Sequence, residues 1–349
     1  MNSLQSILDA GSKIWLDSVD PGHVQAHRAA GVTGATSNPV IVSDIIKTGS
    51  MDQQIAELAE QGKDKADIAW ALTNTLVNDA QQVFEPVWRE TRGDDGYVSF
   101  ELDPLIDAAD STLSHEDRVK RYIELGLKWS KGHRNRMIKV PATPAGIEAL
   151  TDLAAAGVTL NVTLIFTMRQ YEAAREAIWA GATKRPNLDE FKSVYSIFIS
   201  RVDVYTHKHL DALCDDAQGM VGLANAKRLW QSNQKWWADK PVKLQQEIVF
   251  ASTGAKLEGD PPDKYIRELV GSDIMTNPPE TNEMIAESGN PYSRTIDQMP
   301  PDSVLEEIDQ KVDMAELERT LMEEGLAKFA DPHRALIDLI GEKRPAVTG

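Results

Sequence analysis

The sequence contains a single cysteine, Cys214, in its 349 residues, so no disulfide can form within the chain. A chain without disulfides fits a reducing compartment. No stretch approaches the roughly 18 consecutive apolar residues that a membrane span requires. Residues 1–17 also lack the basic start and apolar run of a signal peptide. We therefore expect a cytoplasmic protein that makes no contact with a membrane.

Positive charge is scarce: 37 Lys and Arg residues stand against 54 Asp and Glu, a net charge of −17. This balance disfavours a nucleic-acid partner, because the phosphate backbone would be repelled. A small anionic ligand remains compatible, since one pocket can be locally basic. His207 and His209 stand two residues apart, which does not place them on one helix face. No other set of His, Cys and carboxylates has ligand spacing, so we expect no metal site.

Short β-rich runs alternate with helical stretches along the chain. Several runs are followed by a helix start, such as Pro39 after Asn38 or Pro144 after Thr143. Eight strand–helix units predict an α/β fold, a parallel (β/α)8 TIM barrel formed by residues 1–349 as a single domain. The expected strands are residues 13–19, 34–38, 97–102, 137–141, 159–166, 193–200, 247–253 and 273–277.

Three stretches exceed the minimal strand–helix unit. Residues 51–92 predict two or three extra helices after the second strand, and residues 217–240 a further helical run after the sixth. Residues 302–345 read as two or three C-terminal helices. We expect the segment 302–349 to pack on the barrel rather than to form a second domain.

Polar residues recur on the strand faces that should point into the barrel. Side chains alternate between the two faces of a strand, so Ile14 and Leu16 oppose Trp15 and Asp17. The outward face meets the helices and is apolar, which turns Asp17 inward. The same alternation, applied near the C-terminal strand ends, gives a converging set: Asp17, Asn38, Glu101, Lys139, Asn161, Thr163 and Ser196.

This convergence predicts an active site. Burying unpaired charge costs free energy, and barrel enzymes place their sites at the C-terminal ends of the strands. Lys139 lies between the apolar residues Ile138 and Val140, surroundings that favour a nucleophilic free amine suited to Schiff-base chemistry. The alternative is a structural salt bridge between Lys139 and Asp17 or Glu101, which would need no further polar neighbours.

Five motifs are spread over nearly the whole chain: GATSNPVIV (34–42), IKVPATPAGIEAL (138–150), NVTLIFT (161–167), SIFISRVD (196–203) and FASTGAK (250–256). Together they resemble the transaldolase family. The lysine motif followed by the asparagine–threonine motif on the next strand is the most specific pair.

The resemblance implies catalytic roles for four residues. Lys139 would form a Schiff base with the C2 carbonyl of a ketose phosphate. Asp17 would take the proton from the C4 hydroxyl as the C3–C4 bond breaks, and return it in the reverse addition. Glu101 and Thr163 would hold a water that shuttles protons while the imine forms. Neither a metal nor an organic cofactor takes part.

The resemblance also implies binding roles. Asn38 and Asn161 would bind hydroxyls of the three-carbon unit, and Ser196 would bind near its C1 end. Arg201 and Ser252 would bind the phosphate.

The phosphate site departs from the family pattern at one position. Many relatives have an arginine two residues after the serine equivalent to Ser252. Here that position is Gly254, and Lys256 follows two residues later. We expect Lys256 to supply the missing positive charge.

The implied reaction is the transfer of a dihydroxyacetone unit between sugar phosphates, carried out by a monomer or a homodimer. An alternative is a Schiff-base aldolase that releases free dihydroxyacetone. Fructose 6-phosphate aldolases carry glutamine and tyrosine where this chain has Glu101 and Phe198, which favours the transferase. A barrel that binds sugar phosphates without catalysis is a third possibility, which the presence of Lys139 and Asp17 disfavours.

Overall fold

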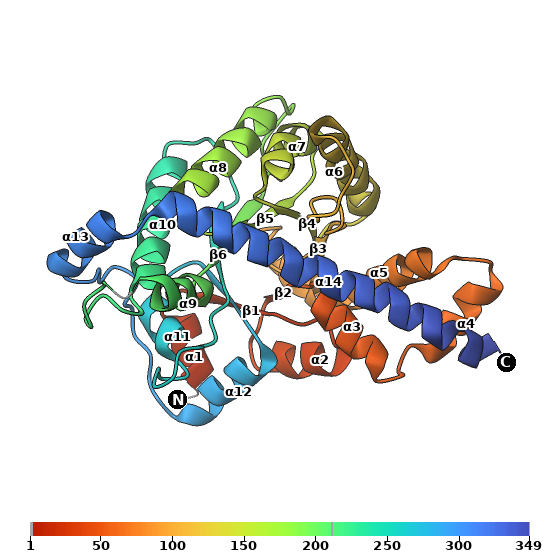
Figure 1. Ribbon diagram of the computed structural model, residues 1–349, viewed down its shortest axis with the longest axis horizontal. Helices are drawn as coiled ribbons and strands as arrows, with labels where there is room; N and C mark the ends of the chain where they lie inside the picture. The colour runs from red at the N-terminus through yellow and green to blue at the C-terminus, as the bar shows by residue number, and fades with distance from the viewer. Residues whose placement is uncertain (1–2, 211, 349) are drawn as a thin grey trace.

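A closed barrel of eight parallel strands forms the centre of the computed structural model, which describes residues 3–210 and 212–348 (Figure 1). Each strand pairs with the next along the chain, and β8 closes onto β1. The predicted (β/α)8 class is confirmed. The strands are β1 (Lys13–Leu16), β2 (Gly34–Ala35), β3 (Val98–Glu101), β4 (Arg136–Pro141), β5 (Leu160–Ile165), β6 (Ser193–Phe198), β7 (Glu247–Ala251) and β8 (Ile274–Asn277).

Several strands end earlier than expected, at the end of the barrel where the site lies. β1 ends at Leu16 and β2 at Ala35, so Asp17 and Asn38 stand in the loops beyond them. Asn38 turns the chain into the next helix, because its Oδ1 accepts hydrogen bonds from the backbone N–H groups of Val40 and Ile41. These loops carry polar side chains over the barrel mouth.

One predicted side-chain direction is wrong. The register between β5 and β6 shifts between Val162 and Ile165, and Leu164 has a φ of 56°. An extra residue in a strand breaks the alternation of faces. Leu164 therefore does not join the outward row, and packs instead in a cluster with Phe166 and Phe198 near the barrel mouth.

Helices surround the barrel, with the predicted additions after β2, after β6 and at the C-terminus. None of the helices in the described part of the chain has the length and apolar character needed to cross a membrane. The helices are α1 (Ser3–Asp9), α2 (Pro21–Ala29), α3 (Pro39–Lys47), α4 (Asp52–Glu60), α5 (Lys65–Glu90), α6 (His115–Ser130), α7 (Pro144–Ala155), α8 (Met168–Ala182), α9 (Ser200–His209), α10 (Val221–Trp237), α11 (Lys264–Leu269), α12 (Pro279–Ser288), α13 (Asp302–Lys311) and α14 (Met314–Thr348).

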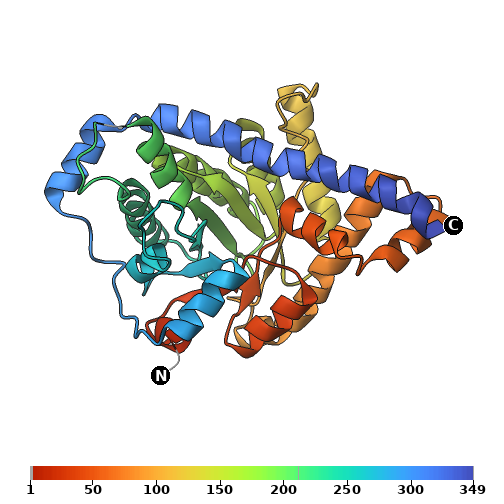
Figure 2. The same ribbon diagram turned by 60° about the horizontal axis from the view of Figure 1, so that its bottom comes forward.

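The long C-terminal helix α14 crosses the molecule and packs against α3, α4, α5 and α9 (Figure 2). Its close approach to the barrel mouth occurs at Gly325. A Cβ atom on this residue would lie 3.0 Å from Cδ2 of Leu164 and 3.7 Å from Nη1 of Arg201. The absence of a side chain at Gly325 thus lets α14 lie directly over the C-terminal end of the barrel.

A layer of large apolar side chains fills the middle of the barrel. Trp15 is fully buried there, and the facing strand accommodates its ring at Gly34, where a Cβ would lie 2.7 Å from Cε2 of the indole. This layer separates the two ends of the barrel interior. Its members are Trp15, Tyr97, Met137, Val194, Val249 and Ile274.

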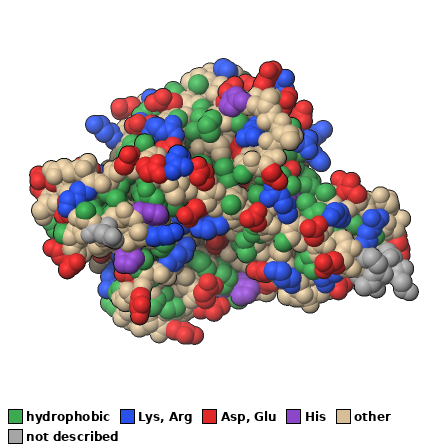
Figure 3. Space-filling model, in the orientation of Figure 1, with side chains coloured by type: hydrophobic (Ala, Val, Ile, Leu, Met, Phe, Trp, Pro, Cys, Tyr) green, Lys and Arg blue, Asp and Glu red, His purple; other side chains and the backbone are tan. Residues whose placement is uncertain are grey.

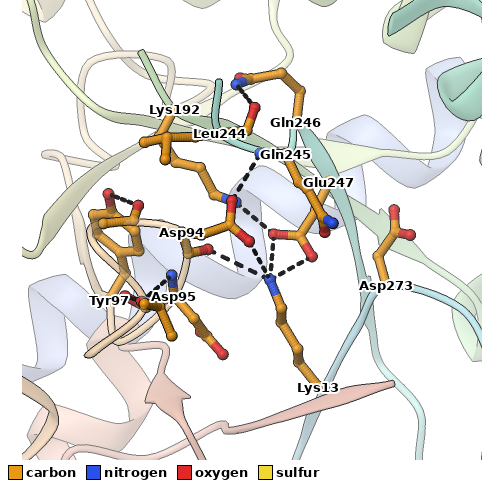
Figure 4. Close-up of polar contacts among 12 residues, drawn as sticks. Lys13, Asp94, Asp95, Tyr97, Lys192, Leu244, Gln245, Gln246, Glu247 and Asp273 are labelled. Atoms are coloured by element: carbon orange, nitrogen blue, oxygen red, sulfur yellow. Dashed lines mark hydrogen bonds and ion pairs between the residues drawn. The ribbon is translucent and has the colours of Figure 1, made fainter. Parts of the chain in front are cut away.

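Below this layer, paired charges close the N-terminal end of the barrel (Figure 4). Lys13 Nζ lies 3.2 Å from Oδ2 of Asp94 and 2.8 Å from Oε1 of Glu247. Lys192, which is fully buried, forms ion pairs with the same two carboxylates. Lys13 and Lys192 therefore each have two acidic partners, and we call Lys13, Asp94, Lys192 and Glu247 the floor cluster.

Candidate active site

A cavity of about 340 Å³ opens at the C-terminal end of the barrel. Of the predicted site residues, only Glu101 and Asn161 do not line it, and both contact residues that do. The predicted residues in its wall are Asp17, Asn38, Lys139, Thr163, Ser196, Phe198, Arg201, Ser252 and Lys256.

Lys139 and Glu101 form a buried pair beside the cavity. The register of β3 and β4 places the two residues opposite each other, and Lys139 Nζ lies 3.2 Å from Oε2 of Glu101. The amine also donates to the carbonyl of Ser37 at 3.4 Å. Burial raises the pKa of Glu101, and the charge of Lys139 opposes this rise. The ion pair between Lys139 and Glu101, considered from the sequence as an alternative, is thus present, but it lies beside the further polar residues of the cavity.

Two threonines, Thr36 and Thr276, hold Asp17 in place beyond the end of β1. Thr36 Oγ1 donates to Oδ1 of Asp17 at 2.8 Å and lies 2.9 Å from Oγ1 of Thr276. Burial raises the pKa of Asp17, whereas Lys139 and the hydrogen bond from Thr36 lower it. A carboxylate with a raised pKa is suited to accept a proton from a substrate hydroxyl. The alternation of side chains along β8 could have predicted from the sequence that Thr276 points inward.

Asn161 lies behind the cavity wall rather than in it. Its side chain is 0% exposed, its Oδ1 accepts from Ser196 Oγ at 2.7 Å, and its Nδ2 donates to Ser99 Oγ at 2.8 Å. The amide oxygen and the amide nitrogen therefore each already have one protein partner. Thr163 differs, because its buried Oγ1 faces the cavity with no hydrogen-bond partner among the described residues.

The far wall of the cavity is cationic. The Arg201 guanidinium stacks 4.8 Å from the centroid of the Phe198 ring, and its buried Nη1 has no hydrogen-bond partner in the described part of the chain. Lys256, exposed at the rim, donates to Ser252 Oγ at 3.0 Å. Within residues 3–210 and 212–348, neither cation forms an ion pair. Such a pair of cations is suited to bind an anion.

Desolvation and mutual repulsion act on these two cations. Burial lowers the pKa of Arg201. Desolvation, with the charges of Arg201 and Lys328, lowers the pKa of Lys256 to about 8. Gly254 lies in the same wall, where a Cβ would meet nothing closer than Thr281 Oγ1 at 4.0 Å. The wall is thus open at Gly254, and Lys256 lies beside the opening.

Phe329 of α14 completes the wall over the lysine, and no sequence pattern pointed to it. Its ring centroid lies 5.4 Å from Lys139 Nζ, and the side chain is only 6% exposed. The start of α12 adds Glu280 and Thr281. No group of three or more His, Cys, Asp or Glu residues is placed to hold a metal ion within the described residues.

The fold and this cavity define a (β/α)8-barrel enzyme with a buried lysine, two carboxylates and a cationic wall at the C-terminal mouth of the barrel. Comparison with known proteins agrees: the model of the transaldolase/fructose-6-phosphate aldolase family matches residues 14–340. The chain belongs to this family, which confirms the resemblance seen in the sequence motifs.

Three similar proteins illustrate the relationship. A protein named "Transaldolase 2" from Streptomyces avermitilis is 32% identical, over 94% of this chain and 93% of its own length. A "Transaldolase" from Arthrobacter sp. is 35% identical over 79% and 78%, respectively. A "Transaldolase" from Trichodesmium erythraeum is 29% identical over 99% of both chains.

Proposed function

We propose that the protein is a transaldolase of the non-oxidative pentose phosphate pathway. It transfers a dihydroxyacetone unit from fructose 6-phosphate or sedoheptulose 7-phosphate to erythrose 4-phosphate or glyceraldehyde 3-phosphate. The observation that carries the proposal is Lys139, buried 3.2 Å from Glu101, in one cavity with Asp17 and an unpaired cationic wall. The names of the similar proteins support the same activity.

In the proposed reaction, the Lys139 amine attacks the C2 carbonyl of the ketose. Glu101 and the partnerless hydroxyl of Thr163 hold the water that takes the proton the nitrogen must lose and passes a proton to the departing substrate oxygen. Loss of water gives the protonated imine, the iminium. Asp17 then takes the proton of the C4 hydroxyl, the C3–C4 bond breaks, C4 leaves as the aldehyde of an aldose phosphate, and the electrons of the bond move to the iminium to give a neutral enamine.

Different residues along the cavity bind different parts of the substrate. Asn38 Oδ1 is occupied by the start of α3, so its amide N–H₂ remains to donate to a substrate hydroxyl. Ser196 lies toward the C1 end, and Asn161 acts through Ser196 by holding its hydroxyl. Arg201, Lys256 and Ser252 bind the phosphate.

The proposal extends to partners and location. The ligands are sugar phosphates, with no metal and no organic cofactor, and the protein is a monomer or a homodimer. Acidic and basic side chains are interspersed over the face in Figure 3, and the chain carries a net charge of −17, which favours no nucleic-acid partner. A cytoplasmic location is supported by the single cysteine, which is free and exposed.

A Schiff-base fructose 6-phosphate aldolase is the alternative. The two activities differ in whether the enamine is protonated before an acceptor arrives. Phe198, which lines the cavity, has no proton to donate, and this favours the transferase.

A coupled assay tests the proposal. Fructose 6-phosphate and erythrose 4-phosphate should give sedoheptulose 7-phosphate and glyceraldehyde 3-phosphate, with EDTA present throughout. Release of free dihydroxyacetone without acceptor should be much slower than transfer. Release as fast as transfer would establish the aldolase instead, and a lack of turnover with all four sugar phosphates would refute both.

A further inference from the structure

Phe329 occupies a position that the proposed mechanism does not use. It comes from α14, and its ring faces Lys139 Nζ at 5.4 Å, within the range of a cation–π contact. It belongs to the apolar cluster at the barrel mouth, together with Leu164 and Phe198. The ring is therefore packed from behind and directed at the reacting nitrogen.

Phe329 also separates two hollows. The inner one is the cavity described above, and a second hollow of about 740 Å³ lies along α14, lined on that helix by residues such as Ala327 and Lys328. Both hollows share Asp17 and Arg201, and Phe329 lines each of them. Removal of this ring would join the outer hollow to the space over Lys139.

We propose that Phe329 is a specificity-determining residue that shields the enamine carbon on Lys139 from protonation by solvent. This inference rests on the proposed function. The ring carries no proton donor and excludes bulk water from the side of the lysine that faces α14. Its face also attracts the positively charged iminium that precedes and follows the enamine.

The chemistry explains why this position controls the outcome. Attack of the enamine carbon on an acceptor aldehyde leads to transfer. Addition of a proton to the same carbon gives the iminium of dihydroxyacetone. One water then adds at C2, the C2–N bond breaks, oxygen remains as the ketone, and nitrogen leaves as the Lys139 ammonium. Release thus consumes one proton and one water, and the protonation step separates it from transfer.

A purely structural role for Phe329 is testable against a matched residue. Leu321 lies on the same helix and in the same apolar cluster, is 2% exposed, and does not line the cavity. Leu321→Ala removes packing between α14 and the barrel without opening the space over Lys139. Phe329→Ala does both, and Phe329→Leu keeps most of the apolar volume should the alanine variant fail to fold.

The experiment measures dihydroxyacetone released from fructose 6-phosphate without acceptor, divided by transfer to erythrose 4-phosphate. We expect Phe329→Ala to raise this ratio at least about tenfold. Phe329→Leu should raise it less, and Leu321→Ala should leave it unchanged. In D₂O, the Phe329 variants should also incorporate deuterium into added dihydroxyacetone faster than the unmodified enzyme does.

Two outcomes would overturn the inference. One is a folded Phe329→Ala or Phe329→Leu variant with an unchanged ratio and unchanged deuterium incorporation. The other is an equal rise in Leu321→Ala. In both cases the unmodified enzyme still performs transfer, whereas failure of the proposed function would appear as an unmodified enzyme without transfer.

Discussion

The two ends of the barrel both bury cations, and they differ in how completely those cations are paired: Lys139 at the mouth has Glu101 as its partner, but the cations beside it have no acidic partner among the described residues. At the floor, Lys13 and Lys192 share the carboxylates of Asp94 and Glu247 (Figure 4). At the mouth, the buried Nη1 of Arg201 has no hydrogen-bond partner among the described residues. Inward polar residues at strand ends are thus not a mark of chemistry in themselves. The binding site is distinguished from the structural cluster by an unpaired cation that also lines a cavity, as Arg201 does.

The pKa values follow the same division. Burial lowers the pKa of Lys13, but the carboxylates of Glu247, Asp95 and Asp94 outweigh burial and hold it above its ordinary value. At the mouth, burial lowers the pKa of Arg201, and desolvation lowers that of Lys256 to about 8. The floor cluster is satisfied by the protein, whereas the mouth is arranged for an anion that comes from outside.

Asp17→Asn should have the largest effect at the mouth. It removes the proposed proton acceptor while keeping the shape and the hydrogen bond from Thr36. We expect the transfer rate to fall by about 10²–10⁴-fold, the usual contribution of a general acid–base group. Thermal stability should hardly change, because burial already disfavours the charge of Asp17. A fall of less than tenfold in kcat would contradict the assignment.

At the floor, Lys192→Met should change stability rather than activity. Removing one partner of a buried ion pair costs about 3–5 kcal/mol of unfolding free energy, and here it leaves Asp94 and Glu247 to share the single cation Lys13. Urea denaturation measures the loss, and transfer per folded molecule should be unchanged. Lys47→Met is the control, since its ion pair with Asp44 is exposed and contributes about 0–1 kcal/mol. Equal losses of unfolding free energy in Lys192→Met and Lys47→Met would contradict a structural role for the floor cluster.

Local geometry made much of the mouth predictable. The alternation of side chains along β4 and β6 depends only on neighbouring residues. The sequence alone therefore predicts that the side chains of Lys139 and Ser196 point into the barrel. The bulge at Leu164 could not be predicted, because a shift between two strands depends on their pairing. For the same reason, the sequence did not reveal that Asn161 lies behind Ser196, with a protein partner on both its amide oxygen and its amide nitrogen.

Long-range packing accounts for what the sequence left unpredicted. Lys13 shares the inward face of β1 with Trp15, so the direction of its side chain could be predicted from the sequence. Its partner Asp94 could not, because Asp94 lies in a loop that has no strand pattern. Phe329 reaches the site only because α14 crosses the mouth, and Gly325 permits that approach. Such contacts depend on how segments far apart in the sequence pack together. The periodicity of apolar residues and the spacing of motifs do not predict that packing.

Arg201→Ala should give the next largest effect. A charge-assisted hydrogen bond to phosphate contributes about 1.5–3 kcal/mol, which corresponds to a rise in KM of roughly 10–150-fold. The rise should be confined to phosphorylated substrates, and unphosphorylated dihydroxyacetone as donor should be affected far less. Comparison of KM for the two kinds of donor measures this difference. Equal changes for both would make Arg201 a structural residue.

The smallest expected effect concerns pH. With a pKa of about 8, Lys256 carries its charge in the free enzyme below that pH and loses it as the pH rises. The KM for fructose 6-phosphate should therefore rise severalfold as the pH increases through 8. Lys256→Arg should abolish this rise, and Lys256→Met should have a high KM at every pH. Persistence of the same pH step in Lys256→Met would assign it to another group.

Trapping of the covalent intermediate tests the central claim most directly. The enzyme is treated with borohydride in the presence of fructose 6-phosphate, and its peptides are examined by mass spectrometry, with Lys139→Met treated in parallel. The account predicts loss of activity and a reduced three-carbon unit on Lys139, with no label on the variant, because an imine is reducible and a simple complex is not. A label on another lysine, or no label on an enzyme that performs transfer, would contradict it.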